Sequence, residues 1–234
     1  MLARPTPIVA MGGESYSLTT TSVFIPRPSW ATEAILGLPV DATLVTLIRP
    51  TAILFYDDSA SGYVDGTGVS LFDNLTLSVS SMTSSDFLYV VYPQQTSVLN
   101  LAFNTLNANA SVLTVEYYNG SYTAVSGLSD GTSSGGATFG QNSSISWTKP
   151  TDEVQTTVTA NGIGVVAGGW VYRLSVSATL DASTVINRFN ARYHSYPGAA
   201  HFLSGSYWFD VTEIAGFEVA AVTGSSTGYV AWMV

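Results

Sequence analysis

Apolar and polar residues alternate with a period of two along most of the chain from residue 41 onward. "ATLVTLI" and "AILFYD" are separated by Pro50, and "VSLFDNLTLSVSSM" alternates with Leu71, Leu75, Leu77 and Val79 as the expected inward residues. This pattern predicts two strands over 42–57, interrupted at Pro50, and further strands at 69–82, 86–93, 97–118, 144–148, 154–159, 170–177, 184–193, 207–222 and 228–234. The gaps leave no room for crossover helices, so we expect an all-β fold, an antiparallel β-sandwich or jelly roll spanning residues 41–234.

The first 40 residues have a different character. Four prolines and a Gly-Gly pair precede Trp30, which favours extended chain with one short strand near Tyr16–Ile25. "SWATEAILGL", residues 29–38, is the best candidate for a short helix, with Ser29 or Thr32 as the cap and Gly37 at its end. We therefore expect residues 1–40 to be an extended N-terminal arm with a possible short helix. Its apolar anchors would be Leu2, Ile8, Val9, Phe24 and Ile25.

The stretch "EYYNGSYTAV", residues 116–125, contains the strongest turn signal of the chain. Asn-Gly favours a type I′ turn, because both central positions need a positive φ. The flanking segments should form a hairpin, in which Glu116 and Tyr118 share one face and Val115 and Tyr117 share the other. Since both faces carry apolar or aromatic residues, one of them is expected to meet a further element or chain. The Gly- and Ser-rich segment 127–140 is expected to be a flexible surface loop.

Charge is scarce in this chain. Asp, Glu, Lys and Arg make up 10% of its 234 residues, against about 25% in ordinary soluble domains, whereas 46% are hydrophobic. A surface with so few charges favours burial against other chains, so we expect a homo-oligomer, most simply a homotrimer. The net charge of −9 leaves only a weak basic group, Arg173, Arg188 and Arg192, so direct binding of nucleic acid is not expected. No apolar run approaches about 18 residues, so no membrane span is expected.

Candidate catalytic and metal-binding residues are few. There is no cysteine, and the two histidines, His194 and His201, flank a turn-like "SYPGAA" outside any nucleophile motif. Asp57, Asp58 and Asp65 could offer oxygens to calcium, but their spacing favours turn formation. We expect no enzymatic activity, no cofactor and no metal. The tryptophans favour a core or interface over a sugar-stacking surface, with Trp170 in the core and Trp232 as a docking anchor.

Residues 85–185 carry a set of motifs that resembles a β-domain of structural proteins from tailed bacteriophages. The matching elements are Asp86-Phe-Leu-Tyr, Asn104 and Asn107 before a strand, Tyr117-Tyr118-Asn119-Gly120, Asp130-Gly131-Thr132, Trp147 with Pro150, and Trp170-Val-Tyr-Arg173-Leu. Two positions differ from this pattern: "SYT" follows Asn119-Gly120 and "TDEV" follows Pro150, where the family carries aromatic residues.

The resemblance implies a virion structural protein that is assembled in the host cytoplasm. Combined with the scarcity of charge, it favours a capsid decoration (cement) protein on the capsid surface, with the major capsid protein and other virion subunits as partners. The alternative is a neck or tail component, or a receptor-binding component that binds carbohydrate. That alternative requires a cluster of exposed aromatic residues.

Overall fold

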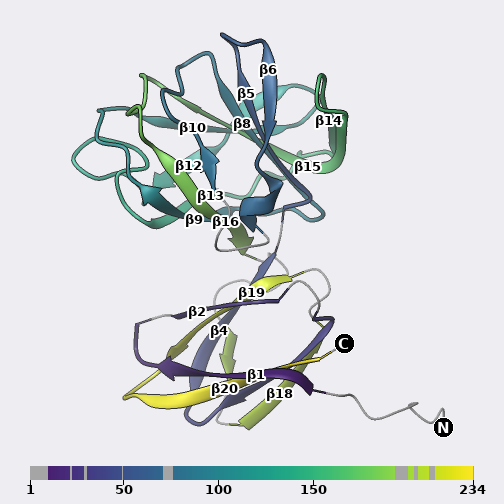
Figure 1. The fold of residues 1–234 in the computed structure, drawn as a ribbon, viewed down its shortest axis with the longest axis vertical. Coiled ribbons are helices and arrows are strands. Elements are labelled where there is room, and N and C mark those ends of the chain that lie inside the picture. The colour runs from purple at the N-terminus through teal and green to yellow at the C-terminus, as the bar shows by residue number, and fades with distance from the viewer. Residues whose placement is uncertain are drawn as a thin grey trace, which may run out of the picture. The chain divides into compact units, whose positions relative to one another are not determined.

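The computed structural model describes residues 10–21, 23–28, 31–48, 50–70, 76–192, 200–202, 205–210 and 214–233. Within these ranges the chain is almost entirely β-structure, and the strands of every ladder described pair antiparallel. The prediction of an all-β antiparallel sandwich is confirmed; the jelly-roll connectivity stays a prediction. The chain forms two compact units (Figure 1). Unit 1 comprises residues 1–48 and 195–234, and unit 2 comprises residues 49–194, so unit 2 is inserted in the sequence between the halves of unit 1.

Unit 1 contains two sheets. The first has the order β1-β20-β3-β18 and the second the order β2-β19-β4-β17. Their strands are β1 (Ala10–Leu18), β2 (Val23–Pro26), β3 (Glu33–Leu38), β4 (Ala42–Ile48), β17 (Ala200–Phe202), β18 (Gly205–Asp210), β19 (Ile214–Ala221) and β20 (Ser226–Met233). The two sheets meet through apolar side chains, among which the rings of Phe217 and Trp232 stack with their centroids 6.0 Å apart.

Unit 2 is a second sandwich. Its larger sheet has the order β11-β10-β15-β8-β5-β6, with β14 also paired to β15. These strands are β5 (Ala52–Asp57), β6 (Gly62–Asp65), β8 (Phe87–Tyr92), β10 (Leu113–Tyr118), β11 (Tyr122–Ala124), β14 (Thr156–Ala160) and β15 (Val165–Val176). Its smaller sheet has the order β12-β13-β9-β16-β7, built from β7 (Leu77–Ser78), β9 (Val98–Thr105), β12 (Ser126–Asp130), β13 (Ser143–Thr148) and β16 (Val185–Arg192). A 3₁₀ turn, η1 (Thr67–Ser70), follows β6.

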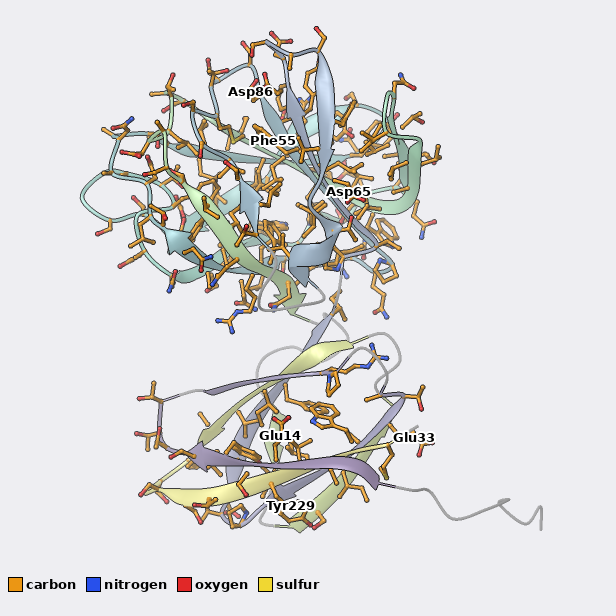
Figure 2. The ribbon with its side chains drawn as sticks, in the orientation of Figure 1. Glu14, Glu33, Phe55, Asp65, Asp86 and Tyr229 are labelled. Atoms are coloured by element: carbon orange, nitrogen blue, oxygen red, sulfur yellow. The ribbon has the colours of Figure 1, made fainter. Side chains whose placement is uncertain are left out.

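The inward residues of unit 2 join its two sheets. Trp147 on β13 packs against Tyr172 on β15, with ring centroids 5.2 Å apart, and the Tyr172 hydroxyl accepts a hydrogen bond from the Thr96 amide at 2.8 Å. Phe55, labelled in Figure 2, is also buried between the sheets. Large aromatic side chains bury the most apolar surface per residue, so these contacts supply much of the driving force for packing.

Two expectations for the N-terminal region are corrected. Residues 29–38 do not form a helix: the segment Glu33–Leu38 is strand β3, paired on both sides by β20 and β18. Its buried Ala34, Leu36 and Leu38 fit a sheet whose inner face is covered, and this tertiary contact outweighs the local capping signals. The described part of the expected arm is not an arm either, because β1 and β2 are strands of unit 1 and Ile25 lies in its core. Leu2, Ile8 and Val9 lie outside the described residues, and only the backbone of Phe24 is described.

Other boundaries also differ from those expected. The structure does not divide the chain at residue 40, since both chain ends build unit 1. Among the described residues of the strand expected over 69–82, residues 69 and 70 end the 3₁₀ turn η1 and only Leu77 and Ser78 form a strand, β7. Leu77 and Val79 are buried as expected, and residues 71–75 lie outside the described residues. The segment 127–140 is not a flexible loop. Its first residues belong to β12, and the rest is a packed turn in which Asp130 accepts hydrogen bonds from Thr132 and Thr138 and Phe139 is fully buried.

The first sheet of unit 1 pairs tyrosines with glycines. Tyr16 on β1 is opposite Gly228 on β20 on the inner face, and its hydroxyl donates a 3.0 Å hydrogen bond to the Gly37 carbonyl. Burial raises the pKa of Tyr16 to about 12, so the hydroxyl keeps its proton. On the outer face, Tyr229 covers Gly37, and its hydroxyl lies 2.8 Å from that of Ser206 (Figure 2). The rings fill the space that a glycine leaves in a strand.

We expect Gly228→Ala to destabilise unit 1 by about 1–3 kcal/mol, because the new methyl group would clash with the buried Tyr16 ring. Native-state hydrogen exchange of the β20 amides measures this change. Gly13→Ala is the matched control in the same sheet: its methyl group would meet only the Val230 carbonyl oxygen, at 3.7 Å. Equal protection in both variants would contradict the tyrosine–glycine packing.

Candidate functional site

The three aspartates considered for calcium hold turns instead. The Asp57 carboxylate accepts hydrogen bonds from Ser59 Oγ at 2.7 Å and from the Ala60 amide at 3.1 Å, and these bonds lower its pKa. The Asp65 carboxylate accepts a hydrogen bond from the Thr67 backbone amide at 2.8 Å. The backbone amide of Asp58 donates a hydrogen bond to the Asp86 carboxylate. Within the described ranges, no group of three or more His, Asp or Glu residues is arranged to hold a metal ion.

The structure describes only some of the histidines and tryptophans for which the sequence made predictions. His194 lies outside the described residues, and His201 lies in β17, where only the backbone is described. Trp147 and Trp232 are buried in the cores of units 2 and 1, so the docking anchor expected at Trp232 is a core residue. Trp170 is half-buried on β15, opposite Tyr92. Trp30 lies outside the described residues, and Trp208 lies in β18 with only its backbone described.

Six aromatic residues gather on the outer face of the larger sheet of unit 2. The strand register puts Tyr56, Tyr63 and Phe87 in one row and Tyr89 in the next, with Tyr118 and Tyr122 paired on β10 and β11. All six are half-buried and point away from the smaller sheet. We call this group, Tyr56, Tyr63, Phe87, Tyr89, Tyr118 and Tyr122, the aromatic face.

An arginine lies at the centre of the aromatic face. The guanidinium carbon of Arg173 on β15 is 4.2 Å from the ring centroid of Phe87 and 4.2 Å from that of Tyr122. Its Nε donates to Glu116 Oε2 at 2.7 Å, and the two residues are opposite each other on β15 and β10. Burial by itself would lower the pKa of Arg173, but the Glu116 carboxylate and the nearby Tyr89 hydroxyl together raise it. Stacking of the planar guanidinium on two rings holds the Arg173 side chain in place while it remains in the ion pair with Glu116.

The rings converge over the sheet. Strands β8 and β11 are separated by β15 and β10, so they would lie about 14 Å apart in a flat sheet with the usual spacing. The ring centroids of Tyr89 and Tyr122 are nevertheless 6.0 Å apart, and Tyr63 lies 6.3 Å from Tyr89. The side chains therefore form a continuous aromatic surface from β6 to β11 rather than separate exposed residues.

The hairpin β14–β15 covers the neighbouring part of the same sheet face. Val158, Ala160 and Ala167 from this hairpin pack with Leu54, Val91 and Val171, and Tyr63, Tyr89 and Tyr122 lie against this cluster. The aromatic face thus has an apolar border on one side. No hydrogen-bond partner among the described residues reaches the hydroxyls of Tyr56, Tyr63 and Tyr118.

The hairpin that carries Tyr118 and Tyr122 forms as expected, with one difference at its turn. β10 and β11 are paired, but three residues, Asn119, Gly120 and Ser121, connect them, and only Gly120 has a positive φ, of 109°. The two-residue type I′ turn is therefore wrong. The face prediction for β10 is confirmed, since Val115 and Tyr117 are buried while Glu116 and Tyr118 are half-buried.

The segment after Pro150 supports this hairpin from outside the sheet. The Asp152 carboxylate accepts a hydrogen bond from the Tyr117 hydroxyl at 2.9 Å and one from the Asn119 side-chain amide at 3.0 Å. The backbone amide of Val154 donates a hydrogen bond to the Tyr118 carbonyl at 2.9 Å. Both hydrogen bonds to its carboxylate lower the pKa of Asp152. Residues 152–154, which follow Pro150, are thus part of the support for the aromatic face.

Glu153 in this segment is an unusual buried acid. It is 6% exposed, and neither carboxylate oxygen has a hydrogen-bond partner among the described residues. Burial raises the pKa of Glu153 to about 7, and the nearby Asp152 adds to this rise, whereas the Tyr172 hydroxyl and the Lys149 ammonium oppose it. Because burial outweighs these two groups, the carboxyl group of Glu153 is more stable in its neutral form than an exposed one would be.

The residues behind the family resemblance are structural. Asp86 is 4% exposed and accepts the amides of Asp58 and Thr83, joining the β5–β6 turn to the segment before β8. Asn107 is 3% exposed; its side chain donates to the Thr138 carbonyl and accepts the Asp181 amide, both at 2.8 Å. With Asp130 in its packed turn, these residues bring distant loops of unit 2 together, which the sequence spacing alone did not indicate.

Comparison of the chain with protein-family models, with curated proteins and with solved structures finds no match. The described residues include no helix with the length and apolar character needed to cross a membrane.

Gly120→Val should destabilise the β10–β11 hairpin by about 1–2 kcal/mol through backbone strain alone, because no atom lies within 4 Å of the new Cβ while φ is 109°. Thermal unfolding followed by circular dichroism measures the loss. Gly62→Val at the β5–β6 turn is the control, since that glycine needs no positive φ and its Cβ would be 3.6 Å from the Ala60 carbonyl oxygen. An unchanged melting temperature for Gly120→Val would refute the turn geometry.

Glu153 should make unit 2 less stable as the pH rises. Because the pKa of Glu153 is raised in the folded protein, its contribution to the free energy of unfolding is fully present below the ordinary pKa of 4.5. That contribution is lost as the pH rises through about 7. After allowance for solvent screening, the loss between pH 5 and pH 8 is about 2 kcal/mol. Urea unfolding of wild type and Glu153→Gln at both pH values tests this: the variant should lose less stability than the wild type. The exposed Glu14→Gln serves as the control, and an identical pH dependence for Glu153→Gln and wild type would rule out the effect.

Proposed function

We propose that this chain is a non-catalytic virion structural protein of a tailed phage, most simply a capsid decoration protein that binds the major capsid protein. The observation that carries this proposal is the position of the resembling motifs. Residues 85–185 fall entirely within unit 2, and Asp86, Asn107 and Asp130 are buried or packed residues that hold its loops together. A resemblance in such framework residues supports a common fold better than scattered surface matches do.

The surface of unit 2 is compatible with attachment by area burial. Val112 and Val166 are each 67% exposed and Val64 is 51% exposed, in a chain with few charges. Burial of apolar surface contributes roughly 25 cal/mol per Å², so a decoration protein needs no reactive group to stabilise a lattice. Repetition of the contact over a homo-oligomer, which we propose to be a trimer, would add effective concentration to each weak site.

A second candidate function, a receptor-binding component at the neck or tail, is favoured by the aromatic face. The sequence-based alternative required clustered, accessible aromatic residues. The six rings on the larger sheet of unit 2 are clustered, but they meet the requirement of accessibility only in part, because they are half-buried. Both candidates are structural and non-catalytic, and they differ in where the chain lies on a particle.

Immunogold electron microscopy of particles from cells that produce this chain distinguishes the two candidates. We expect a regular array of label over the capsid surface, while label confined to a tail tip or neck would favour the receptor-binding alternative. Light scattering of the purified chain should give three times the mass of one chain. An absence of label from all particles, with controls for antibody access, would reject the virion proposal.

A further inference from the structure

We propose that the aromatic face of unit 2 binds a neutral glycan, with pyranose rings lying on the tyrosines between β6 and β11. This inference deepens the receptor-binding candidate above by naming a ligand class for its surface, and its test does not depend on where the chain is located on a particle. It assigns a ligand class to a surface formed by three observations: the convergence of the rings, the neutralised charge at its centre, and the hydroxyl groups at its margin.

The apolar part of the site consists of the aromatic rings of the aromatic face, which extend across the sheet from β6 to β11. Tyr56 and Tyr63 have centroids 4.9 Å apart, and Tyr118 and Tyr122 have centroids 5.4 Å apart at the other side of the face. A pyranose presents C–H groups on its faces and hydroxyls around its edge, so it can bury its apolar face on an aromatic ring. Neighbouring rings of the face are tilted by 45° to 70° relative to each other, so sugar units would contact individual rings rather than one flat platform.

The charge of the site argues for a neutral ligand. Glu116 and Arg173 are 17% and 20% exposed, form an ion pair with each other, and the guanidinium is enclosed by Phe87 and Tyr122. An anionic ligand would therefore find no unpaired cation at the centre and would meet the field of a chain with a net charge of −9. The outer carboxylate and guanidinium atoms can still hydrogen-bond with sugar hydroxyls.

The polar groups at the margin provide the remaining recognition. The hydroxyls of Tyr56, Tyr63 and Tyr118 have no hydrogen-bond partner among the described residues, and each can donate one and accept two hydrogen bonds. Sugar hydroxyls offer the same combination of donor and acceptor. A purely apolar ligand, such as an acyl chain, would leave these groups without partners on burial.

The position of the site on a sheet face also limits its occupants. The central strands β5, β8, β15 and β10 are each paired on both sides, so their backbone groups are used within the sheet. An extended peptide could add to the sheet only at an edge, not across this face. A second copy of the chain is the main competing occupant, and the experiment separates it from a glycan.

Titration of the full chain with neutral hexasaccharides of glucose, mannose, galactose and xylose, followed by NMR of its tyrosine ring signals, tests the proposal. We expect at least one of them to shift the signals of Tyr56, Tyr63 or Tyr118, assigned through Tyr→Phe variants, and a heparin hexasaccharide to shift none. Tyr118→Ala and Tyr56→Ala should each weaken the binding about ten-fold, as expected for loss of one aromatic contact. Val112→Ser, at the exposed residue just before β10 and outside the aromatic face, should bind as the wild type does.

Several results would overturn the proposal. These are no shift with any of the four neutral hexasaccharides, shifts confined to tyrosines outside the aromatic face, or preferential binding of heparin. Self-association that Tyr118→Ala abolishes while no sugar binds would identify a second copy as the occupant. Because the NMR mapping uses the wild-type chain, the test remains decisive even where an alanine variant is unfolded. Failure to bind sugar would leave the capsid labelling result unaffected, so the two proposals are distinguishable.

Discussion

The alternation of side chains along β15 is the constraint on which unit 2 depends. Consecutive residues of a strand must point to opposite faces of the sheet, so Tyr172 and Arg173 have opposite environments. Tyr172 points inward, where it contacts Trp147 of the other sheet and accepts the Thr96 amide. Arg173 points outward, where it pairs with Glu116 and separates two rings of the aromatic face. A shift of β15 by one residue would bury the guanidinium and expose the phenol, so the core and the outer surface share one register.

Hydrogen-bonded polar side chains hold the loops of unit 2 together. Asp86, Asn107 and Asp130 each accept or donate several hydrogen bonds to loop backbone or to threonine hydroxyls. A satisfied polar network of this kind specifies one loop arrangement, because any alternative leaves buried groups without partners. Glu153 is an acidic exception among the described residues of unit 2, and its carboxyl group lies in the same segment that supports the β10–β11 hairpin. The rigidity of the loops and the pH sensitivity of this segment therefore have the same physical origin.

Local patterns predicted the strands well and the long-range organisation poorly. The period of two placed β4, β5, β8 and β13 within a residue or two, and Asn119-Gly120 correctly marked a hairpin. The helix expected at 29–38 failed because cap residues are a local signal, whereas the pairing of β3 with β18 and β20 depends on residues about 170 to 200 positions away. For the aromatic face, the sequence predicted only that both faces of the strand containing Tyr118 carry apolar or aromatic residues. Its other rings come from β5, β6, β8 and β11, and no spacing in the sequence reveals which strands become neighbours.

The pairing of β1 with β20 has a mechanical consequence. Ala10 is opposite Met233 and Leu18 is opposite Ser226, so the outer ends of the first and last described strands lie side by side. A force that separates these two ends would load the hydrogen bonds of the ladder one after another, as in a zipper, rather than all together in shear. Unit 2, whose chain enters and leaves through the interior of the unit 1 sequence, would carry no tension until that zipper had opened. The fold thus shields its inserted sandwich from a pull on the chain ends by means of a closure that yields at low force.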